Sequence, residues 1–512
     1  MTIVFQESRN SLYIPEIESL LDRVARLPEV ESVTRSEKHP KFRPGYFTQY
    51  HLVGLKSGPG LPSKNDTIDR IEDLFKRDIS PDLTVYVTGR AVVDRDAQRI
   101  SKADLGRAEL VALPLTLITL LFVFGSWVAA AIPIVMGLLS VSTTLGCLYW
   151  VAQQMEMSVL AINFASMLGL GLGIDYALLM VNRFRQERQV RSKSEAIARM
   201  VETAGEAVFV SGLTVCISLA CLMMFPIALL RSISIAGSLV VMFSVTVALT
   251  VLPALLMLVG DRIRWSNDET TKPRGQFWRT IAQWVTRHSV LSLLGVLLVI
   301  IVLSAPFLQA ELGLGDASVL PPDVPARQGV EVIQSAFGPG EPSPILLAVS
   351  TPNDQSKILS GEPIDRLYTL TQKFQGDPRV LRVKSLFNLP LPPVELPPEA
   401  PPETPIPTVL EQYKQLYTMV QPPPAIAEAV KVFSSETTTL IAITSKTDSH
   451  SPESHQLVKE LRSMDFGPLQ ASVGGQTAME IDTLAAVAQQ FPRILGATMA
   501  ITFVVLCILL SR

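Results

Sequence analysis

The stretch Asn163–Arg185, NFASMLGLGLGIDYALLMVNRFR, decides how the chain folds. It is an apolar run of helical length with one carboxylate, Asp175, inside it. Asp175 precedes Arg183 by about eight residues, or roughly 12 Å of helix, and Arg183 and Arg185 are placed to anchor the run at a membrane edge. A bilayer core is about 30 Å thick, so Asp175 is expected well inside it. An ionised carboxylate costs about 2.5–3.5 kcal/mol there, and the stretch therefore predicts a buried protonatable site in a helix bundle.

The residues next to Asp175 fit such a site. Tyr176 adds a hydroxyl, and Gly169, Gly171 and Gly173 precede it. The spacing Gly169-x-x-x-Gly173 predicts a small-residue face on which another helix can approach closely. A nucleotide-binding loop is disfavoured, because no strand precedes these glycines and they do not keep the G-x-G-x-x-G spacing. Two plainer roles stay open: Asp175 as a structural hydrogen-bonding residue, and the glycines as packing residues only.

Composition excludes several classes of protein. The chain has 512 residues and a formal net charge of −3, which is too small to suggest nucleic acid as a partner. The five histidines are scattered without metal-ligand spacing, and the cysteines lie in apolar blocks, so we expect no disulfide framework, no metal site and no cofactor. No cluster suggests an enzyme. The four cysteines are Cys147, Cys216, Cys221 and Cys507.

Seven apolar stretches are long enough to cross a bilayer. They are Glu109–Ser126, Trp127–Val151, Ser158–Asn182, Ala204–Phe225, Ser232–Gly260, Ser289–Leu308 and Phe491–Leu510. Basic residues mark the side of the membrane, because segments 183–199 and 262–287 each carry six Lys or Arg, whereas connections 152–157 and 226–231 carry one between them. The positive-inside rule places the two basic segments in the cytoplasm and the large polar regions outside it.

Two polar regions show the same order of short strands and amphipathic helices, β-α-β-β-α-β, which is the ferredoxin-like pattern. In the first region the elements are Thr2–Glu7, Pro15–Leu27, Val30–Arg35, Tyr46–Leu55, Thr67–Asp78 and Leu83–Thr88. In the second they are Ile345–Ser350, Ile364–Phe374, Val380–Phe387, Thr438–Ser445, Pro452–Ser463 and Leu469–Val473.

The two regions also align residue by residue. VTGRAVVDRD (87–96) matches VGGQTAMEID (473–482), with Gly89 opposite Gly475 and Asp96 opposite Asp482. This predicts a parallel internal repeat of the kind common in transporters. The second region carries an insertion, 388–436, whose proline-rich parts favour an extended polyproline arm, and we expect a linker rather than a docking arm.

These stretches carry a family resemblance. GLGLGIDYALLMVNRFRQE resembles the fourth-helix motif of the MMPL branch of the resistance–nodulation–division (RND) exporters. Further matching stretches are Gly205-Glu206-Ala207, Val210-Ser211-Gly212-Leu213-Thr214, Leu230-Arg231-Ser232, Gly237 and Leu252-Pro253-Ala254-Leu255-Leu256. The resemblance implies that Asp175 and Tyr176 relay protons, with Ser211 and Thr214 as candidate neighbours, and that the proton gradient drives export of lipids or other hydrophobic molecules.

The chain departs from the family pattern at both ends. In the family each half holds a leading helix, a periplasmic porter domain and five more helices. Here no apolar helix precedes residue 1, and the sequence stops after the first span of the second half. We therefore expect a fragment, a mis-started reading frame or one product of a split gene, with the missing second-half helices or a partner chain supplying the rest.

The predicted architecture is an α-helical membrane bundle with two α+β ferredoxin-like periplasmic porter domains, a truncated RND/MMPL arrangement in the bacterial inner membrane. The expected parts are porter domains 1–105 and 309–488, a five-helix membrane block 106–260, a cytoplasmic linker 261–288, and membrane helices 289–308 and 489–512. The expected partners are a lipid or hydrophobic substrate, the membrane and protons, in a monomer or homo-trimer. Two alternatives are a SecDF-like accessory of protein translocation and a non-transporting lipid sensor of the Patched or sterol-sensing type.

Overall fold

The computed structural model describes most of the chain as two compact units. The sheet unit comprises Met1–Arg99 and Gly313–Leu484, and the helical unit comprises Ile100–Leu312 and Ala485–Arg512. The described residues are 1–7, 14–35, 47–56, 58, 62–81, 83–155, 157–262, 275–309, 313, 315–352, 357–389, 408–419 and 423–510.

The first half of the sheet unit is a four-stranded antiparallel sheet in the order β2-β3-β1-β4. Its elements are β1 (Thr2–Glu7), α1 (Ile14–Ala25), β2 (Val30–Arg35), β3 (Phe47–Leu55), α2 (Lys64–Asp78) and β4 (Leu83–Thr88). Helix α2 buries Ile68, Ile71 and Phe75, which recur at helical spacing. It begins earlier than predicted because the Ser63 side chain accepts a hydrogen bond from the Asp66 backbone N–H and caps the helix.

The second half has the corresponding order, β6-β7-β5-β8. Its elements are β5 (Ile345–Ser350), α12 (Glu362–Gln375), β6 (Val380–Lys384), β7 (Thr438–Ser445), α15 (Pro452–Ser463) and β8 (Gln470–Gly474). Even the irregularities correspond, since the register shifts between Val30 and Ser32 in one half and between Val380 and Arg382 in the other. Strand β6 is shorter than predicted because Ser385 caps a short helical turn by accepting from the Phe387 N–H.

Each half passes from its last strand into a long helix through a glycine. Gly89 and Gly475 have φ values of 94° and 98°, a left-handed conformation that favours glycine. A Cβ on Gly475 would also lie 2.6 Å from the Pro344 carbonyl oxygen. The helices that follow are α3 (Arg90–Phe124) and α16 (Gln476–Leu510). The internal repeat predicted from these residues is therefore present in the fold.

The insertion of the second half differs from the prediction. Its described part contains two helices, α13 (Val409–Thr418) and α14 (Pro424–Phe433), so an extended linker over 388–436 is wrong there. Thr408 and Glu411 form a capping box at α13, and a proline in the first turn of α14 loses no helical hydrogen bond. Both helices bury apolar side chains in the core of the second half. Residues 390–407 and 420–422, with most of the prolines, lie outside the described residues.

A buried ionic network joins the two halves of the sheet unit. Glu341, 7% exposed, receives hydrogen bonds from the Tyr50 hydroxyl and from Lys384 Nζ, the latter at 2.6 Å. Lys384 Nζ also donates to the Tyr50 hydroxyl at 2.7 Å, and the Tyr50 ring packs edge-on against Phe337 of α11 (Pro325–Phe337). Burial alone would raise the pKa of Glu341, but the charge and hydrogen bonds of Lys384 and Tyr50 hold that pKa below its ordinary value of 4.5. Its contribution to stability is therefore present above about pH 4.5 and is lost as the pH falls through the lowered native pKa.

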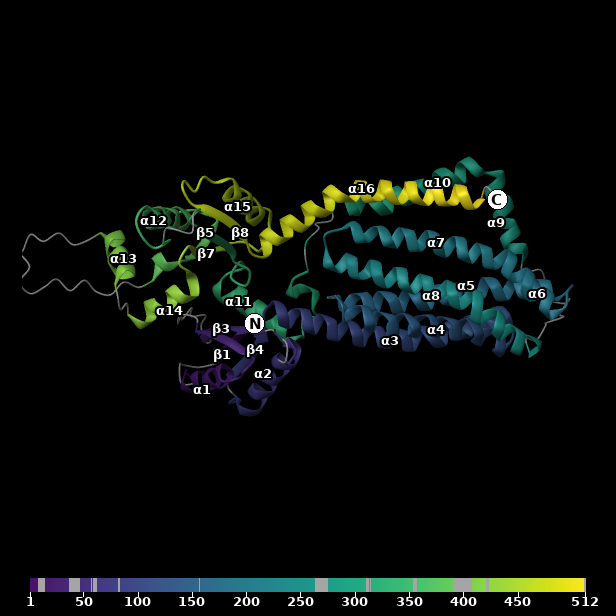
Figure 1. Ribbon diagram of the computed structural model, residues 1–512, viewed down its shortest axis with the longest axis horizontal. Coiled ribbons are helices and arrows are strands. Elements are labelled where there is room, and N and C mark those ends of the chain that lie inside the picture. Colours follow the sequence, from purple (N-terminus) through teal and green to yellow (C-terminus); the bar gives the residue numbers. More distant parts are fainter. Residues whose placement is uncertain are drawn as a thin grey trace, which may run out of the picture. The chain divides into compact units, whose positions relative to one another are not determined.

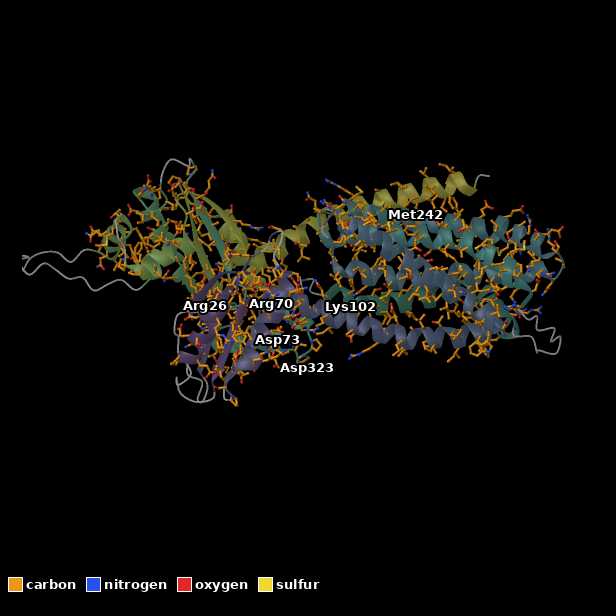
Figure 2. The ribbon with its side chains drawn as sticks, turned by 60° about the horizontal axis from the view of Figure 1, so that its bottom comes forward. Arg26, Arg70, Asp73, Lys102, Met242 and Asp323 are labelled. Carbon is orange, nitrogen blue, oxygen red and sulfur yellow. The ribbon has the colours of Figure 1, made fainter. Side chains whose placement is uncertain are left out.

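The helical unit holds the apolar helices. Within the described residues, seven helices are long and apolar enough to cross a membrane. They are built from α3, α4 (Trp127–Ala152), α5 (Val159–Arg188), α6 (Lys193–Met200) continuing into α7 (Glu206–Ala220), α8 (Ala228–Val259), α10 (Ser289–Ser304) and α16. Helices α4, α5, α7 and α8 pack on one another (Figure 1), whereas α10 buries no residue. Figure 2 labels Met242 of α8 among the carbon-rich side chains of the helical unit, and it labels the exposed residues Arg26, Arg70 and Asp73 in the sheet unit.

The basic segments are more helical than predicted. Helix α5 continues to Arg188, and α6 begins after Ser192, whose capping box with Glu195 starts the helix. Helix α9 (Gly275–Arg287) occupies part of the predicted linker 261–288. Lys193 Nζ lies 2.6 Å from Asp261, which brings the start of α6 and the end of α8 to the same end of the helical unit.

The ionic network yields a stability prediction. Lys384→Met removes the cation nearest to the buried Glu341 carboxylate and leaves Arg382, 4.0 Å away, so the free energy of unfolding should fall by about 1–3 kcal/mol. Thermal unfolding of the detergent-purified protein measures this. Lys459→Met on the exposed face of α15 is the matched control and should stay within about 0.5 kcal/mol. Equal effects of the two substitutions would show that the network does not stabilise the sheet unit.

Candidate functional site

Two glycines of α5 lie at helix crossings in the helical unit. The helix begins after Ser158, whose side chain caps the Leu160 N–H. A Cβ on Gly173 would lie 2.6 Å from the Gly137 Cα of α4, and one on Gly169 would lie 2.5 Å from Val240 of α8. Backbone atoms cannot move aside as a flexible side chain can, so Gly173 sets how closely α4 and α5 approach.

Gly171 does not take part in this packing. It is exposed, and no atom lies within 4 Å of the position of a Cβ. The packing role predicted for Gly171 is therefore wrong within the described residues. The two-residue spacing from Gly169 and Gly173 explains this, because it turns Gly171 to the opposite side of the helix.

Asp175 lies on the same open side. It is exposed, so the prediction that it is buried inside the bundle is wrong for this chain. Asp175 is one of four exposed residues spaced four apart, here called the α5 stripe: Met167, Gly171, Asp175 and Leu179. Met167 is 65% exposed and Leu179 is 49% exposed, so an apolar surface surrounds the carboxylate. The four-residue spacing was visible in the sequence, but an apolar run does not reveal which face is packed.

Tyr176 points the other way. It is 6% exposed, and its hydroxyl lies against α7, 3.6 Å from where a Cβ on Gly212 would be. That hydroxyl is buried, and Ser211 is the polar side chain beside it, although the pair does not meet the geometry of a hydrogen bond. Asp175 and Tyr176 are thus neighbours in sequence that face different surroundings, one open and one enclosed.

The two candidate neighbours on α7 differ as well. Ser211 is exposed, whereas Thr214 is half-buried and donates its hydroxyl hydrogen bond to the Ser211 carbonyl of its own helix at 2.7 Å. Only Ser211 therefore has a hydroxyl free of that intrahelical bond. The arrangement thus places a carboxyl group on the open face of α5 and a tyrosine hydroxyl without a hydrogen bond on the enclosed face.

The apolar helices and the α5 stripe define the class of protein, which is a multi-pass membrane protein with a folded α+β unit. Residues 46–292 match the model of the MMPL family, so this part of the chain is similar to the members of that family. This confirms the predicted MMPL branch of the RND superfamily and places the protein in the bacterial inner membrane.

Three curated relatives are similar in sequence to this chain. A membrane protein of Streptomyces coelicolor is 35% identical over 56% of this chain and 40% of its own length. The mycolic acid-containing lipids exporter MmpL11 of Mycolicibacterium smegmatis is 32% identical over 52% of this chain and 29% of its own length. The trehalose monomycolate exporter MmpL3 of Mycobacterium tuberculosis is 30% identical over 61% of this chain and 37% of its own length. The chain thus spans 29–40% of these relatives.

The glycines give a matched pair of substitutions. Gly173→Ala forces a methyl group onto the Gly137 backbone and should lower stability by about 1–3 kcal/mol. Gly171→Ala meets open space and should be neutral, or stabilising by up to about 1 kcal/mol from helix propensity. Thermal unfolding in detergent compares the two. If Gly171→Ala were the more destabilising variant, the assignment of packed and open faces on α5 would be wrong.

Proposed function

We propose that this chain is part of an RND-type exporter that uses the proton gradient to move lipids or other amphipathic molecules out of the inner membrane. Two of its relatives are named as exporters of lipids that contain mycolic acid and of trehalose monomycolate. The observation that carries the proposal is Asp175 in the apolar α5 stripe. None of the three relatives is named for protein translocation or sterol sensing, so those alternatives receive no support from them.

The α5 stripe must be covered in the membrane. An ionised carboxylate that faces acyl chains costs about 2.5–3.5 kcal/mol. We infer that further membrane helices, such as the greater length of the relatives provides, pack on this stripe. Gly171 lies one turn from Asp175 and leaves room for a close approach. A polar group on the covering helix would then face Asp175.

Proton binding would change that contact. A proton that moves down 100 mV releases about 2.3 kcal/mol, and each pH unit adds about 1.4 kcal/mol. These energies match the cost of the carboxylate charge in the apolar stripe. Protonated Asp175 would favour contact with an apolar part of the covering helix, and ionised Asp175 would favour contact with its polar group. Binding of one proton would therefore suffice to shift the covering helix. Tyr176 would tune this equilibrium from the enclosed side.

The sheet unit would handle the substrate. We infer that its two halves are porter domains of the ferredoxin-like type, outside the cytoplasm. The strand orders β2-β3-β1-β4 and β6-β7-β5-β8 support the fold. The basic end of the helical unit near Lys193 supports the orientation, because basic residues favour the cytoplasmic side. Helices α3 and α16 continue directly from β4 and β8, so movement in the membrane would reach both sheets.

Topology can be tested with single cysteines. In a background without the four native cysteines, Ser360→Cys should react with a membrane-impermeant maleimide in intact cells. Ser194→Cys should react only after the cytoplasm is opened. Both serines are exposed, so accessibility is limited by the membrane and not by folding. The reverse labelling pattern would contradict the proposed orientation.

The proton-coupling role can be tested at Asp175. Asp175→Asn keeps the size of the side chain but removes titration, so gradient-driven lipid export in the native host should fall to background. Protein level should be unchanged or higher, because a neutral amide costs less to bury than a carboxylate. Asp175→Glu keeps a titratable group and should retain part of the activity. Normal gradient-driven export by Asp175→Asn, at equal protein level, would leave Asp175 without a role in coupling.

A further inference from the structure

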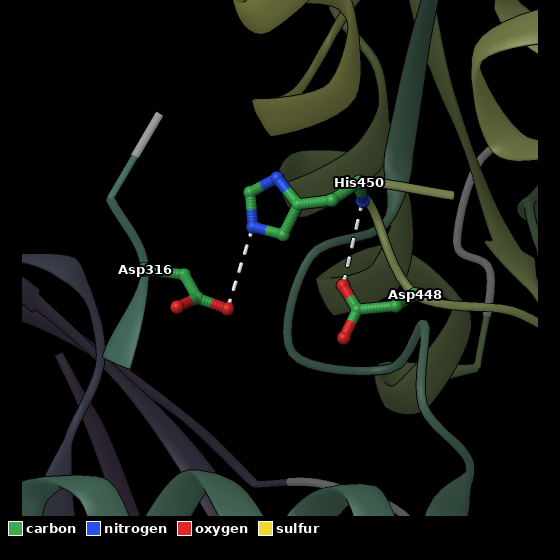
Figure 3. A group of neighbouring side chains, drawn as sticks. All are labelled: Asp316, Asp448 and His450. Atoms are coloured by element: carbon green, nitrogen blue, oxygen red, sulfur yellow. Dashed lines mark hydrogen bonds and ion pairs between the residues drawn. The ribbon is translucent and has the colours of Figure 1, made fainter. Parts of the chain in front are cut away.

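A group of metal-ligating side chains lies in the sheet unit. Asp316 precedes the helical turn Ala317–Val319, while Asp448 and His450 lie between β7 and α15. One ligand atom from each of these residues lies within 4.8 Å of the others. His450 Nε2 is 3.3 Å from Asp316 Oδ2, and Asp448 Oδ1 accepts a hydrogen bond of 3.5 Å from the His450 backbone N–H (Figure 3). The sequence did not reveal the group, because the residues come from distant segments.

A residue outside this group orients the histidine. The His450 Nδ1 atom lies 2.7 Å from Oε2 of Glu480, a carboxylate of α16 that is 1% exposed. A buried carboxylate beside Nδ1 favours a proton on that nitrogen, which leaves Nε2, the ring nitrogen that faces Asp316, as the atom available to bind a metal. A carboxylate that holds one imidazole nitrogen while the other faces a metal is the usual outer shell of a metal-binding histidine.

The distances fit a small divalent cation. Zinc–ligand distances of about 2.0–2.2 Å in a tetrahedral site place neighbouring ligand atoms roughly 3.4 Å apart, close to the 3.3 Å between His450 Nε2 and Asp316 Oδ2. Three carboxylates, Asp316, Asp448 and Glu480, surround one imidazole, and a cation of charge 2+ offsets most of their charge. An imidazole ligand favours zinc and related transition metals over calcium or magnesium.

The group also has an open side. Asp316, Asp448 and Ser449 line a cleft of about 100 Å³ within the sheet unit, which Gly89 and Gln476 also line. Three protein ligands beside a cleft leave a coordination position for water or another ligand. The cleft therefore provides an entry path for the metal.

We propose that Asp316, Asp448 and His450 bind one divalent transition metal, with zinc as the best match, and that Glu480 positions His450. Such a metal would tie three parts of the sheet unit together: the segment before α11, the β7–α15 connection and the first turns of α16. The proposal is independent of proton coupling at Asp175, which lies in the other unit.

Zinc binding to the detergent-purified full chain tests the proposal. After chelator treatment, isothermal titration with Zn²⁺ should give one site per chain, and Co²⁺ should give the visible absorption of a tetrahedral site. Asp316→Asn and His450→Gln should each weaken binding at least tenfold. Glu480→Gln should weaken it about 10–100-fold without changing the stoichiometry, as expected for a positioning residue.

Two further measurements keep the test decisive. His288→Gln, an exposed histidine of the helical unit, is the matched control and should leave zinc affinity unchanged. The Co²⁺ spectrum is measured on the unmodified chain, so this test does not depend on whether a variant folds. Absence of that spectrum, or zinc binding that is unchanged in both Asp316→Asn and His450→Gln, would overturn the proposal and leave an ion-paired cluster.

Discussion

The ionic contact of Glu341 with Lys384 and Tyr50 joins the two halves of the sheet unit, and much else depends on that junction. A buried carboxylate is tolerated only where cations and hydrogen-bond donors surround it, and Glu341 receives bonds from both halves of the repeat. Because the network needs residues from strands β3, β6 and β7, it forms only when both sheets are folded and adjacent. The two halves therefore behave as one compact unit despite being separate copies.

Asp175 presents the opposite situation, and the contrast carries the functional argument. Glu341 has partners for its charge, whereas Asp175 has no hydrogen bond or ion pair to another described residue and lies in an apolar stripe. A carboxyl group in such a place costs free energy whenever it is ionised. The simplest role for Asp175 is therefore one in which it is reversibly protonated, as proton coupling requires. A purely structural hydrogen-bonding role fits less well, because the described residues supply no partner for it.

The sequence predicted the strands and membrane helices closely, because apolar periodicity and length are local properties. It failed where tertiary contacts decide. The proline-rich composition of the insertion predicted an extended linker and not the helices α13 and α14. These helices form because Thr408 caps α13 and because apolar side chains of both helices pack in the core. The open face of α5 could not be predicted, since most positions from Val159 to Val181 are apolar and contacts with the neighbouring helices determine which face is packed. Asp316 and His450 meet only through the fold.

Comparison of the two halves of the repeat separates residues that the common fold requires from residues that only one half uses. Gly89 and Gly475 take the same left-handed conformation, so that junction is common to both halves. In the sequence alignment Glu480 corresponds to Asp94, yet Asp94 pairs with Arg90 on the exposed surface of its own helix, whereas Glu480 is buried against His450. Folding of the repeat thus does not require a buried carboxylate at this position. An asymmetric buried acid beside a histidine is better explained by a function confined to the second half, and metal binding is the function that its geometry favours.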